Sequence, residues 1–344
     1  MPTTYIGADV DCRMTEIAAE ENRQIIYRSR VPTTITALRS ELAKFTGKKI
    51  FVIEECAMAS WLYRNLQPFA TEVVVCDPRR NALVFKDGDK ADDLDAAALA
   101  KLCRGGFLRK VHHPLDEDRQ ALREAVALYY DRVEQRVSSL NKFYAACYMH
   151  GISARRNQIE NVEWREEFLG ACPRFLRRQL EILSLEIDSV FEQSRLAKQL
   201  LVDRAKKFSM IENFCELPGV KWVRASTVFA YIDTPFRFKT IKKIWKYCGI
   251  GLQRFASGSD KIGNPKSGRV KLFKHVNYRL KTSIFGAALS AIICGGNEFS
   301  EHYKRMIRNG VSACNARHTV ARKMLTVMVG MCKTDSQYVP GLRN

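Results

Sequence analysis

The sequence lacks paired cysteines, a long apolar run and an N-terminal leader pattern. Its 11 cysteines are odd in number and stand singly with no Cys-x-x-Cys pair, which argues against a disulfide framework and a zinc ribbon. The longest apolar stretch, near Ile284–Cys294, is far shorter than the roughly 20 residues that a membrane span needs. Residues 1–12 contain no basic region followed by an apolar one, so no signal peptide is predicted. We expect a cytoplasmic protein with reduced thiols and no membrane partner.

Acidic residues are scarce in the last third of the chain. From Leu217 onward, 23 Lys and Arg face 5 Asp and Glu, whereas the preceding 216 residues hold 33 against 32. Such a basic end predicts a polyanionic partner, because binding to phosphates releases condensed counterions. An anionic membrane surface is the alternative, and nucleic acid is favoured because no long Lys-rich amphipathic helix with an aromatic face is present. The sequence also has no phosphate-cradling P-loop, so an ATP-driven step is not indicated.

The first hundred residues alternate strand-like and helical patterns. Three consecutive strands come first, and β-α-β-α units follow them. The predicted strands are Thr4–Val10, Thr15–Ala19, Gln24–Val31, Lys49–Ile53 and Glu72–Cys76, and the predicted helices are Thr34–Phe45, Trp61–Phe69 and Asp92–Cys103. This order is that of an α/β domain with an RNase H-like fold.

The rest of the chain is predicted to be mostly helical. Asp116–Ala146 and Asn161–Lys207 have apolar residues at three- and four-residue spacing, which favours a helical hairpin or coiled coil over a plain bundle. A new unit begins at Glu216–Val220, and residues Gly249–Arg269 form a predicted loop in its most basic part. Its predicted helices are Ala225–Tyr231, Thr240–Tyr247, Val276–Ala291 and Arg317–Met331. The expected domains are residues 1–110 (α/β), 111–212 (helical connector and oligomerisation region) and 213–344 (basic, mostly α).

Four carboxylates stand at places typical of a metal site. Asp9 and Glu54 end predicted strands, and Asp92 and Asp95 open a helix three residues apart on one face. Two divalent ions roughly 3.5–4 Å apart can activate a nucleophile and stabilise a leaving oxygen in phosphoryl transfer. Hard oxygen ligands suit Mg²⁺, with Mn²⁺ as a substitute. The neighbouring Asp11, Glu55 and Asp93 compete for the same roles, and Asp92 and Asp95 alone would suit a helix N-terminus.

The segments around these carboxylates are Ile6–Val10, Val52–Cys56 and Lys90–Ala96. They resemble the DEDD transposases of bacterial insertion sequences, relatives of the pilin-gene invertases. The family pattern selects Asp9, Glu54, Asp92 and Asp95 as the catalytic, metal-binding residues. It implies a RuvC-like N-terminal domain, a helical connector and a C-terminal domain with a catalytic serine.

The resemblance continues in the basic C-terminal part. Leu217–Val220 resembles the family's helix-hairpin-helix entry, and Arg254–Ser259 resembles its Ser-Gly loop. The second match implies that Ser257 is the nucleophile, with Ser259 as the alternative. Lys221 departs from the usual second Gly of the hairpin, Ala57 from a Gly and Leu252 from a Pro. The expected nucleic-acid contacts are Arg254, Lys261, Lys266, Arg269, Lys271, Lys274 and Arg279.

The resemblance implies a DNA recombinase that cleaves and rejoins strands through a serine–phosphodiester intermediate. It further implies a homo-oligomer, dimer or tetramer, with an active site shared between protomers, and a noncoding guide RNA that pairs with donor and target DNA. One alternative is a Mg²⁺-dependent nuclease of the Holliday-junction resolvase type without a covalent intermediate. Another is a nucleic-acid-binding protein with an inactive nuclease fold. The pair His112–His113 has no further ligands at metal spacing and is expected at the surface.

Overall fold

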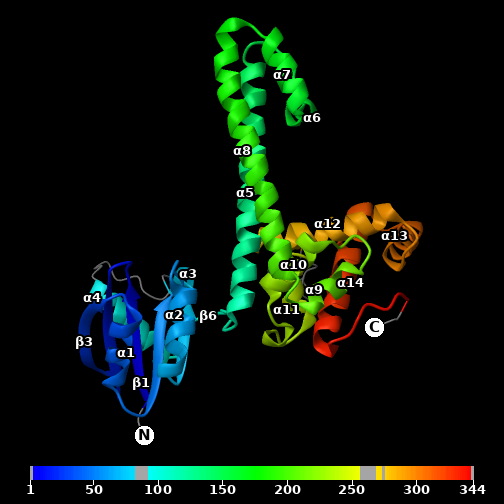
Figure 1. Cartoon of the computed structure of the whole chain (residues 1–344). Helices are drawn as coiled ribbons and strands as arrows, with labels where there is room; N and C mark the ends of the chain where they lie inside the picture. Colours follow the sequence, from blue (N-terminus) through cyan, green and yellow to red (C-terminus); the bar gives the residue numbers. More distant parts are fainter. Residues whose placement is uncertain (1–2, 82–91, 256–268, 273–275, 342–344) are drawn as a thin grey trace, which may run out of the picture. The chain divides into compact units, whose positions relative to one another are not determined.

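The computed structural model describes residues 3–81, 92–255, 269–272 and 276–341 (Figure 1). The chain forms two compact units, Met1–Glu117 and Asp118–Asn344. The three-part division at residues 110 and 212 stays a prediction. No helix of the described ranges is both long and apolar enough to cross a membrane.

The N-terminal unit is built on a six-stranded mixed sheet with the order β3-β2-β1-β4-β5-β6. The first three strands are antiparallel neighbours, β4 and β5 continue parallel to β1, and β6 closes the edge antiparallel to β5. The strand bounds are Thr3–Val10, Met14–Glu21, Gln24–Pro32, Lys48–Glu54, Glu72–Cys76 and Lys110–Val111. The five predicted strands are confirmed, whereas the two-residue β6 was not predicted.

Helices cover both faces of this sheet. On one face, α1 (Ile35–Ala43) and α2 (Ala59–Leu66) pack on alternate strand residues, including Ile6, Phe51 and Ile53. On the other face, α4 (Asp92–Arg104) packs on the intervening residues, including Val52. Successive strand side chains point to opposite faces, so the strands are apolar on both sides, as expected for a covered sheet. The short segments η1 (Gln67–Phe69) and α3 (Pro78–Asn81) complete the unit.

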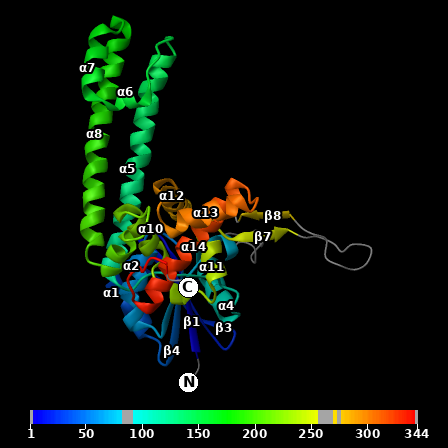
Figure 2. The ribbon, with the colours of Figure 1, turned by 90° about the vertical axis from the view of Figure 1, so that its right-hand side faces the viewer.

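Two long helices form an arm in the C-terminal unit. Helix α5 (Glu117–Tyr148) runs beside α8 (Arg174–Ala205), and α6 (Arg156–Glu160) and α7 (Val162–Ala171) lie at the far end (Figures 1 and 2). The prediction of a single helix for Asn161–Lys207 is therefore wrong, because the segment forms two helices that are separated at residues 172–173. Pro173 has no N–H for the helical ladder and disfavours a helical Cys172, so α7 ends there and α8 begins.

The opposite end of the arm shares a core with the remaining helices. Leu122 of α5 and Leu201 of α8 are buried in one cluster with residues of α9, α10, α12 and α14. The bounds are α9 Ser209–Cys215, α10 Trp222–Ile232, η2 Pro235–Arg237, α11 Ile241–Tyr247, α12 Tyr278–Cys294, α13 Glu298–Arg308 and α14 Ala313–Thr334. The predicted helices of this region are confirmed, but α9 and α13 were not predicted.

The predicted loop Gly249–Arg269 begins and ends in strands. β7 (Leu252–Phe255) pairs antiparallel with β8 (Arg269–Leu272), with Leu252 opposite Leu272 and Phe255 opposite Arg269 (Figure 2). The prediction was therefore wrong for residues 252–255 and 269. Four-residue strands have too few alternations to stand out in a sequence, and their pairing supplies the hydrogen bonds that stabilise them.

Candidate active site

Asp9 and Glu54 lie at the same end of two adjacent parallel strands. Asp9 is the penultimate residue of β1, and Glu54 is the last residue of β4. The parallel register pairs Ala8 with Ile53, so the two acidic residues follow at the next position of each strand. Two carboxylates 45 residues apart in the sequence are thereby placed side by side at one edge of the sheet.

The alternation of side chains along the strands also places Asp9 and Glu54 on the same face of the sheet. Gly7 of β1 and Val52 of β4 face α4, and each lies two residues before its acidic residue. Side chains two apart on a strand share a face, so Asp9 and Glu54 lie on the side that α4 covers. Helix α4 is the helix that carries Asp92 and Asp95.

Gly7 permits an unusually close approach of α4 to β1. A β-carbon at this position would lie 2.1 Å from the carbonyl oxygen of Ala96 and 2.7 Å from the backbone nitrogen of Ala100. Any side chain here would push the helix away from the strand. Glycine at position 7 is therefore required by the contact between two backbones.

The direction of α4 brings its first turn toward Asp9. Arg104, at the end of α4, donates to the buried Glu20 with an Nε–Oε1 distance of 2.6 Å. Glu20 lies opposite Tyr5, near the start of β1, whereas the middle of α4, from Ala96 to Ala100, lies over Gly7. The helix thus runs antiparallel to β1, and its N-terminal turn lies at the end of the sheet where Asp9 and Glu54 stand.

The four predicted carboxylates differ in how far they are described. Asp95 is exposed, whereas for Asp92 only the backbone is described, as the first residue of α4. Among the described side chains, no three His, Cys, Asp or Glu residues are close enough to hold a metal ion, and Asp92 is not part of that set. The backbone arrangement brings the elements of Asp9, Glu54, Asp92 and Asp95 to one edge of the sheet, and hard oxygen donors of this kind fit a divalent cation.

Glu55 is engaged on the opposite face of the sheet. One of its carboxylate oxygens lies 2.7 Å from Nε2 of His113, and Nδ1 of the same ring lies 2.8 Å from Oγ of Ser60 in α2. His113 is only 6% exposed, and its ring packs against that of Tyr63. The expectation that the His pair lies at the surface was therefore wrong for His113, because this side chain links the end of β4 to α2.

Two further acidic residues, Asp11 and Asp93, stand near the predicted carboxylates in the sequence. Asp11 follows β1 in a turn, where hydrogen bonds from the backbone N–H groups of Cys12 and Arg13 hold the pKa of its carboxyl below the ordinary value. For Asp93 only the backbone is described.

The predicted nucleophile Ser257 lies outside the described residues, as do Ser259, Lys261, Lys266 and Lys274. The paired strands β7 and β8 bracket this segment. Arg254 lies opposite Val270, and Lys271 lies opposite Gln253. The backbones of Arg254, Arg269 and Lys271 are therefore gathered in one hairpin, and nothing further is described of their side chains.

Arg279 has structural partners inside the C-terminal unit. It stands in the first turn of α12, with its guanidinium 5.7 Å from the ring centre of Tyr130 and one nitrogen 3.8 Å from a carboxylate oxygen of Glu134. Tyr130 in turn bonds Ser283 of α12 at 2.7 Å. These contacts attach α12 to α5, and a phosphate contact of Arg279 stays a prediction.

The turn Leu217–Val220 packs against α12. Gly219 has a φ of +79°, and a β-carbon there would lie 2.4 Å from the carbonyl oxygen of Ala287. Lys221, where a second Gly was expected, has a φ of −132° and a ψ of 172° as the N-cap of α10. Any residue adopts this extended conformation, so position 221 does not need the backbone freedom of a glycine, and the Lys causes no strain.

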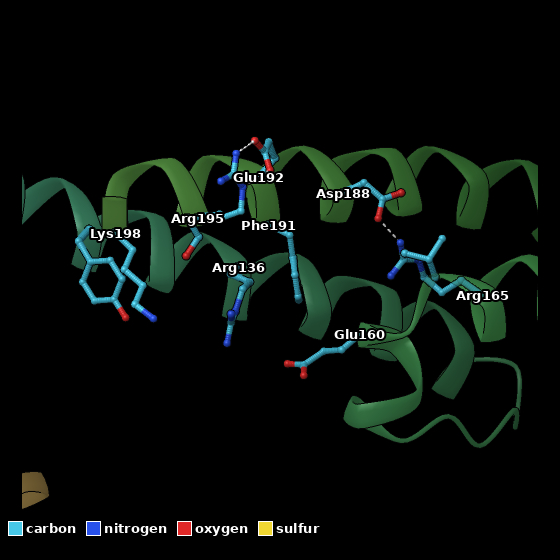
Figure 3. Close-up of a pocket in the computed structure, with 11 residues that line it drawn as sticks. Arg136, Glu160, Arg165, Asp188, Phe191, Glu192, Arg195 and Lys198 are labelled. Carbon is cyan, nitrogen blue, oxygen red and sulfur yellow. Dashed lines mark hydrogen bonds and ion pairs between the residues drawn. The ribbon is translucent and has the colours of Figure 1, made fainter. Parts of the chain in front are cut away.

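The arm contains an open groove between α5, α8 and the α6–α7 branch (Figure 3). Its charged residues are largely paired with one another. Arg195 binds both carboxylate oxygens of Glu192, and the buried Arg165 pairs with Asp188. Of the predicted catalytic residues whose side chains are described, Asp9, Glu54 and Asp95, none lines the groove.

Comparison with known proteins identifies the chain's relatives. A DEDD transposase profile of the IS110 group, described as "Transposase", matches residues 7–147. A second profile, "Transposase IS116/IS110/IS902 family", matches residues 211–304. A curated protein of Sinorhizobium fredii (strain NBRC 101917 / NGR234), named "Putative transposase y4qE", is 24% identical over 284 residues, which cover 78% of this chain and 68% of the relative. The two profiles cover the carboxylate elements and the region from α9 to α13, and the chain belongs to the IS110 family of transposases.

Proposed function

We propose that this transposase cleaves and rejoins DNA through a covalent serine–phosphodiester intermediate at Ser257, assisted by divalent ions held by four carboxylates. The observation that carries the proposal is the approach of α4 to β1 at Gly7, which directs the first turn of α4 toward Asp9 and Glu54. The strand order, with three antiparallel strands followed by two parallel ones, supports a RuvC-like assignment for this unit.

Asp9, Glu54, Asp92 and Asp95 would hold Mg²⁺, with Mn²⁺ able to replace it. The bound ions would supply positive charge that activates the nucleophile and stabilises the leaving oxygen. The chain's own contribution is to fix the ligands on two strands and one helix that pack rigidly together. Glu55 takes no part, because the sheet directs it to His113 on the other face.

Ser257 would attack the phosphorus of a DNA phosphodiester with its hydroxyl oxygen. The new bond joins serine oxygen to phosphorus, and the bond to one DNA strand breaks, so that this strand leaves with a protonated hydroxyl. Rejoining reverses these changes, since the hydroxyl of another strand attacks the phosphoserine and releases the serine. The phosphoester bond is conserved throughout, which is the general advantage of covalent catalysis and requires no ATP.

The carboxylates and the serine belong to different compact units of the chain, Met1–Glu117 and Asp118–Asn344. We infer an active site in which the carboxylate unit of one protomer meets the serine of another, with the arm as the oligomerisation element. The RNA-guided choice of donor and target sites belongs to the same proposal. Base pairing would then select sequence, and the basic C-terminal unit would hold nucleic-acid backbone.

The decisive experiment searches for a protein–DNA adduct that survives denaturation. The full chain is expressed with the noncoding DNA flanking its gene, and wild type is compared with Ser257→Ala, Ser259→Ala and Asp92→Ala, with and without Mg²⁺. We expect a Mg²⁺-dependent adduct that is absent in Ser257→Ala and Asp92→Ala and kept in Ser259→Ala. Cleaved DNA without an adduct, unaffected by Ser257→Ala, would instead identify a resolvase-like nuclease.

A further inference from the structure

Four lysines lie on the short helix α11 or just before it. Lys239, Lys242, Lys243 and Lys246 are all exposed. Within α11, the lysines at 242, 243 and 246 are spaced three and four apart, so they share a face. Ile244 is buried on the opposite side, together with the partly buried Trp245 and Ile241. We call the four residues the lysine face.

The lysine face has no acidic counterpart in the described structure. None of the four lysines forms an ion pair with a described residue, although ion pairs are frequent elsewhere in this unit. The surrounding sequence explains this, since residues 234–297 hold 13 Lys and Arg and one acidic residue, Asp260. Like charges at these helical spacings repel one another. An uncompensated cluster of this kind is complementary to a polyanion.

The helix that presents the lysines is firmly anchored. The indole nitrogen of Trp245 lies 3.3 Å from the hydroxyl oxygen of Thr326 in α14. Arg322 of α14 donates to the carbonyl oxygen of Ile250 at 2.8 Å, and the backbone N–H of Ile250 donates to the carbonyl oxygen of Trp245 at 2.9 Å. The lysine face is therefore presented on a rigid support.

The same anchoring joins the lysine face to the hairpin of the proposed nucleophile. Only the residues 248–251 separate α11 from β7. A β-carbon on Gly251 would lie 2.7 Å from the backbone nitrogen of Lys246, so the turn folds directly back on the helix. A nucleic acid held on the lysine face would thus be held next to the start of the strand that leads toward Ser257.

We propose that the lysine face binds the phosphate backbone of duplex DNA beside the β7–β8 hairpin. This inference rests on the proposed function, because the strand that Ser257 attacks is DNA. Lys242 and Lys246 lie about 6 Å apart along the helix axis, a length over which duplex DNA carries about three to four phosphate charges. Lysine acts as a point charge toward phosphate, so the contacts position the duplex without selecting its sequence.

The test is the salt dependence of DNA binding by the full chain. Lys242, Lys243 and Lys246 are replaced together by Gln, and the Kd for a duplex from the element's end is measured over a range of salt concentrations. We expect the slope of log K against log[salt] to fall by about 0.9 for each lysine–phosphate interaction that the substitutions remove. The matched control replaces Lys198, Lys206 and Lys333 by Gln, three exposed lysines of the same unit without an ion pair to a described residue.

The control should keep the wild-type slope despite the same reduction in charge. Equal slopes for the two triple variants would overturn the proposal, since only net charge would then matter. A lowered slope with a structured RNA but not with duplex DNA would also overturn it. A wild type that binds DNA but forms no adduct would refute the proposed function while leaving the DNA-binding test of the lysine face valid.

Discussion

Glu54 and Glu55 are consecutive acidic residues that the sheet sends to opposite faces. The first stands at the edge toward α4, and the second bonds the buried His113 beside α2. Charge and chain position are almost identical for the two residues, so only the family resemblance distinguished Glu54 from Glu55 in the sequence. Glu54 is the last residue of β4, and the backbone N–H of Glu55 still donates to the carbonyl oxygen of Cys76 on β5. The alternation of side chains along the strand therefore extends to Glu55 and separates the two residues.

His113 should be important for the stability of the N-terminal unit. Replacing it with Ala removes a ring that bonds both Glu55 and Ser60, and leaves polar groups beneath the sheet without this partner. We expect the free energy of unfolding to fall by about 1–3 kcal/mol, because each of the two lost hydrogen bonds contributes about 0.5–1.5 kcal/mol. Chemical denaturation of the purified variant would measure this.

The matched control for this prediction is the adjacent His112→Ala. His112 is half-buried, and so its removal should cost less stability than the removal of His113. If both variants unfold at the same denaturant concentration as wild type, the bridge between β4 and α2 contributes nothing measurable to stability.

At the scale of the elements, the direction of helix α4 across the sheet determines which residues lie near Asp9 and Glu54. The helix approaches β1 at a position where only glycine fits, and its end is held by the pair Arg104–Glu20.

Helix α13 illustrates the opposite situation, in which the sequence contained a local signal for the start of the helix but the prediction missed it. Asn297 caps it by accepting from the backbone N–H groups of Phe299 and Ser300. An Asn after two Gly residues and before an apolar-charged alternation is a recognisable helix start.

Gly7→Ala should separate α4 from β1. The added methyl would lie 2.1 Å from the carbonyl oxygen of Ala96, and because both partners are backbone, no side-chain rotation can relieve the overlap. We expect the free energy of unfolding to fall by about 1–3 kcal/mol, as for other overpacked sites. The DNA adduct should also be reduced in protein that remains folded, since the first turn of α4 would move away from Asp9.

Gly170→Ala in α7 is a suitable comparison. Nothing lies within 4 Å of the β-carbon that this change would add. Alanine favours a helix over glycine by about 1 kcal/mol, so this variant should be as stable as wild type or more stable. A Gly7→Ala protein with unchanged thermal unfolding would contradict the close contact of α4 and β1.

The residues of the proposed active site belong to two different compact units. The four carboxylates lie in the first unit, and Ser257, the lysine face and the arm belong to the second. The arm shares its inner core with the C-terminal helices through Leu122 and Leu201. A second apolar cluster, which includes Phe143 and Leu180, lies toward its far end. The inner end of the arm is therefore packed against the C-terminal helices, whereas its far end has an apolar cluster of its own.

An active site shared between protomers can be tested by mixing two inactive variants. Asp92→Ala keeps the serine, and Ser257→Ala keeps the carboxylates, so coexpression should restore the adduct if the two halves come from different chains. For randomly paired dimers we expect up to about a quarter of the wild-type adduct, since half of them are mixed and each holds one intact site. Denaturing gels of the mixed protein with DNA would measure the recovery.

Adduct recovery must depend on coexpression, and it should be absent when either variant is expressed alone. Complete failure of the mixed protein, with oligomers shown to contain both variants, would mean that the carboxylates and the serine act within one chain.

Local sequence patterns were sufficient to predict most elements and the type of chemistry. Period-two and period-3.6 patterns placed the five main strands and most helices, because burial of one or both faces leaves such a pattern along the chain. The order of the motifs around Asp9, Glu54, Asp95 and the Arg254–Ser259 segment placed the chain among transposases. The charge count separated the basic C-terminal part from the rest.

Contacts between residues far apart in the sequence determine where each side chain points and which side chains it meets. The opposite directions of Glu54 and Glu55 follow from the alternation of side chains along the extended chain, and the burial of His113 accompanies its contacts with Glu55 and Ser60. The unstrained conformation of Lys221 depends on a turn seated on α12, and the isolation of the lysine face depends on which acidic residues fold nearby. A linear pattern of hydrophobicity and charge does not encode such features, because it records each residue's own character and not the residues that the fold brings beside it.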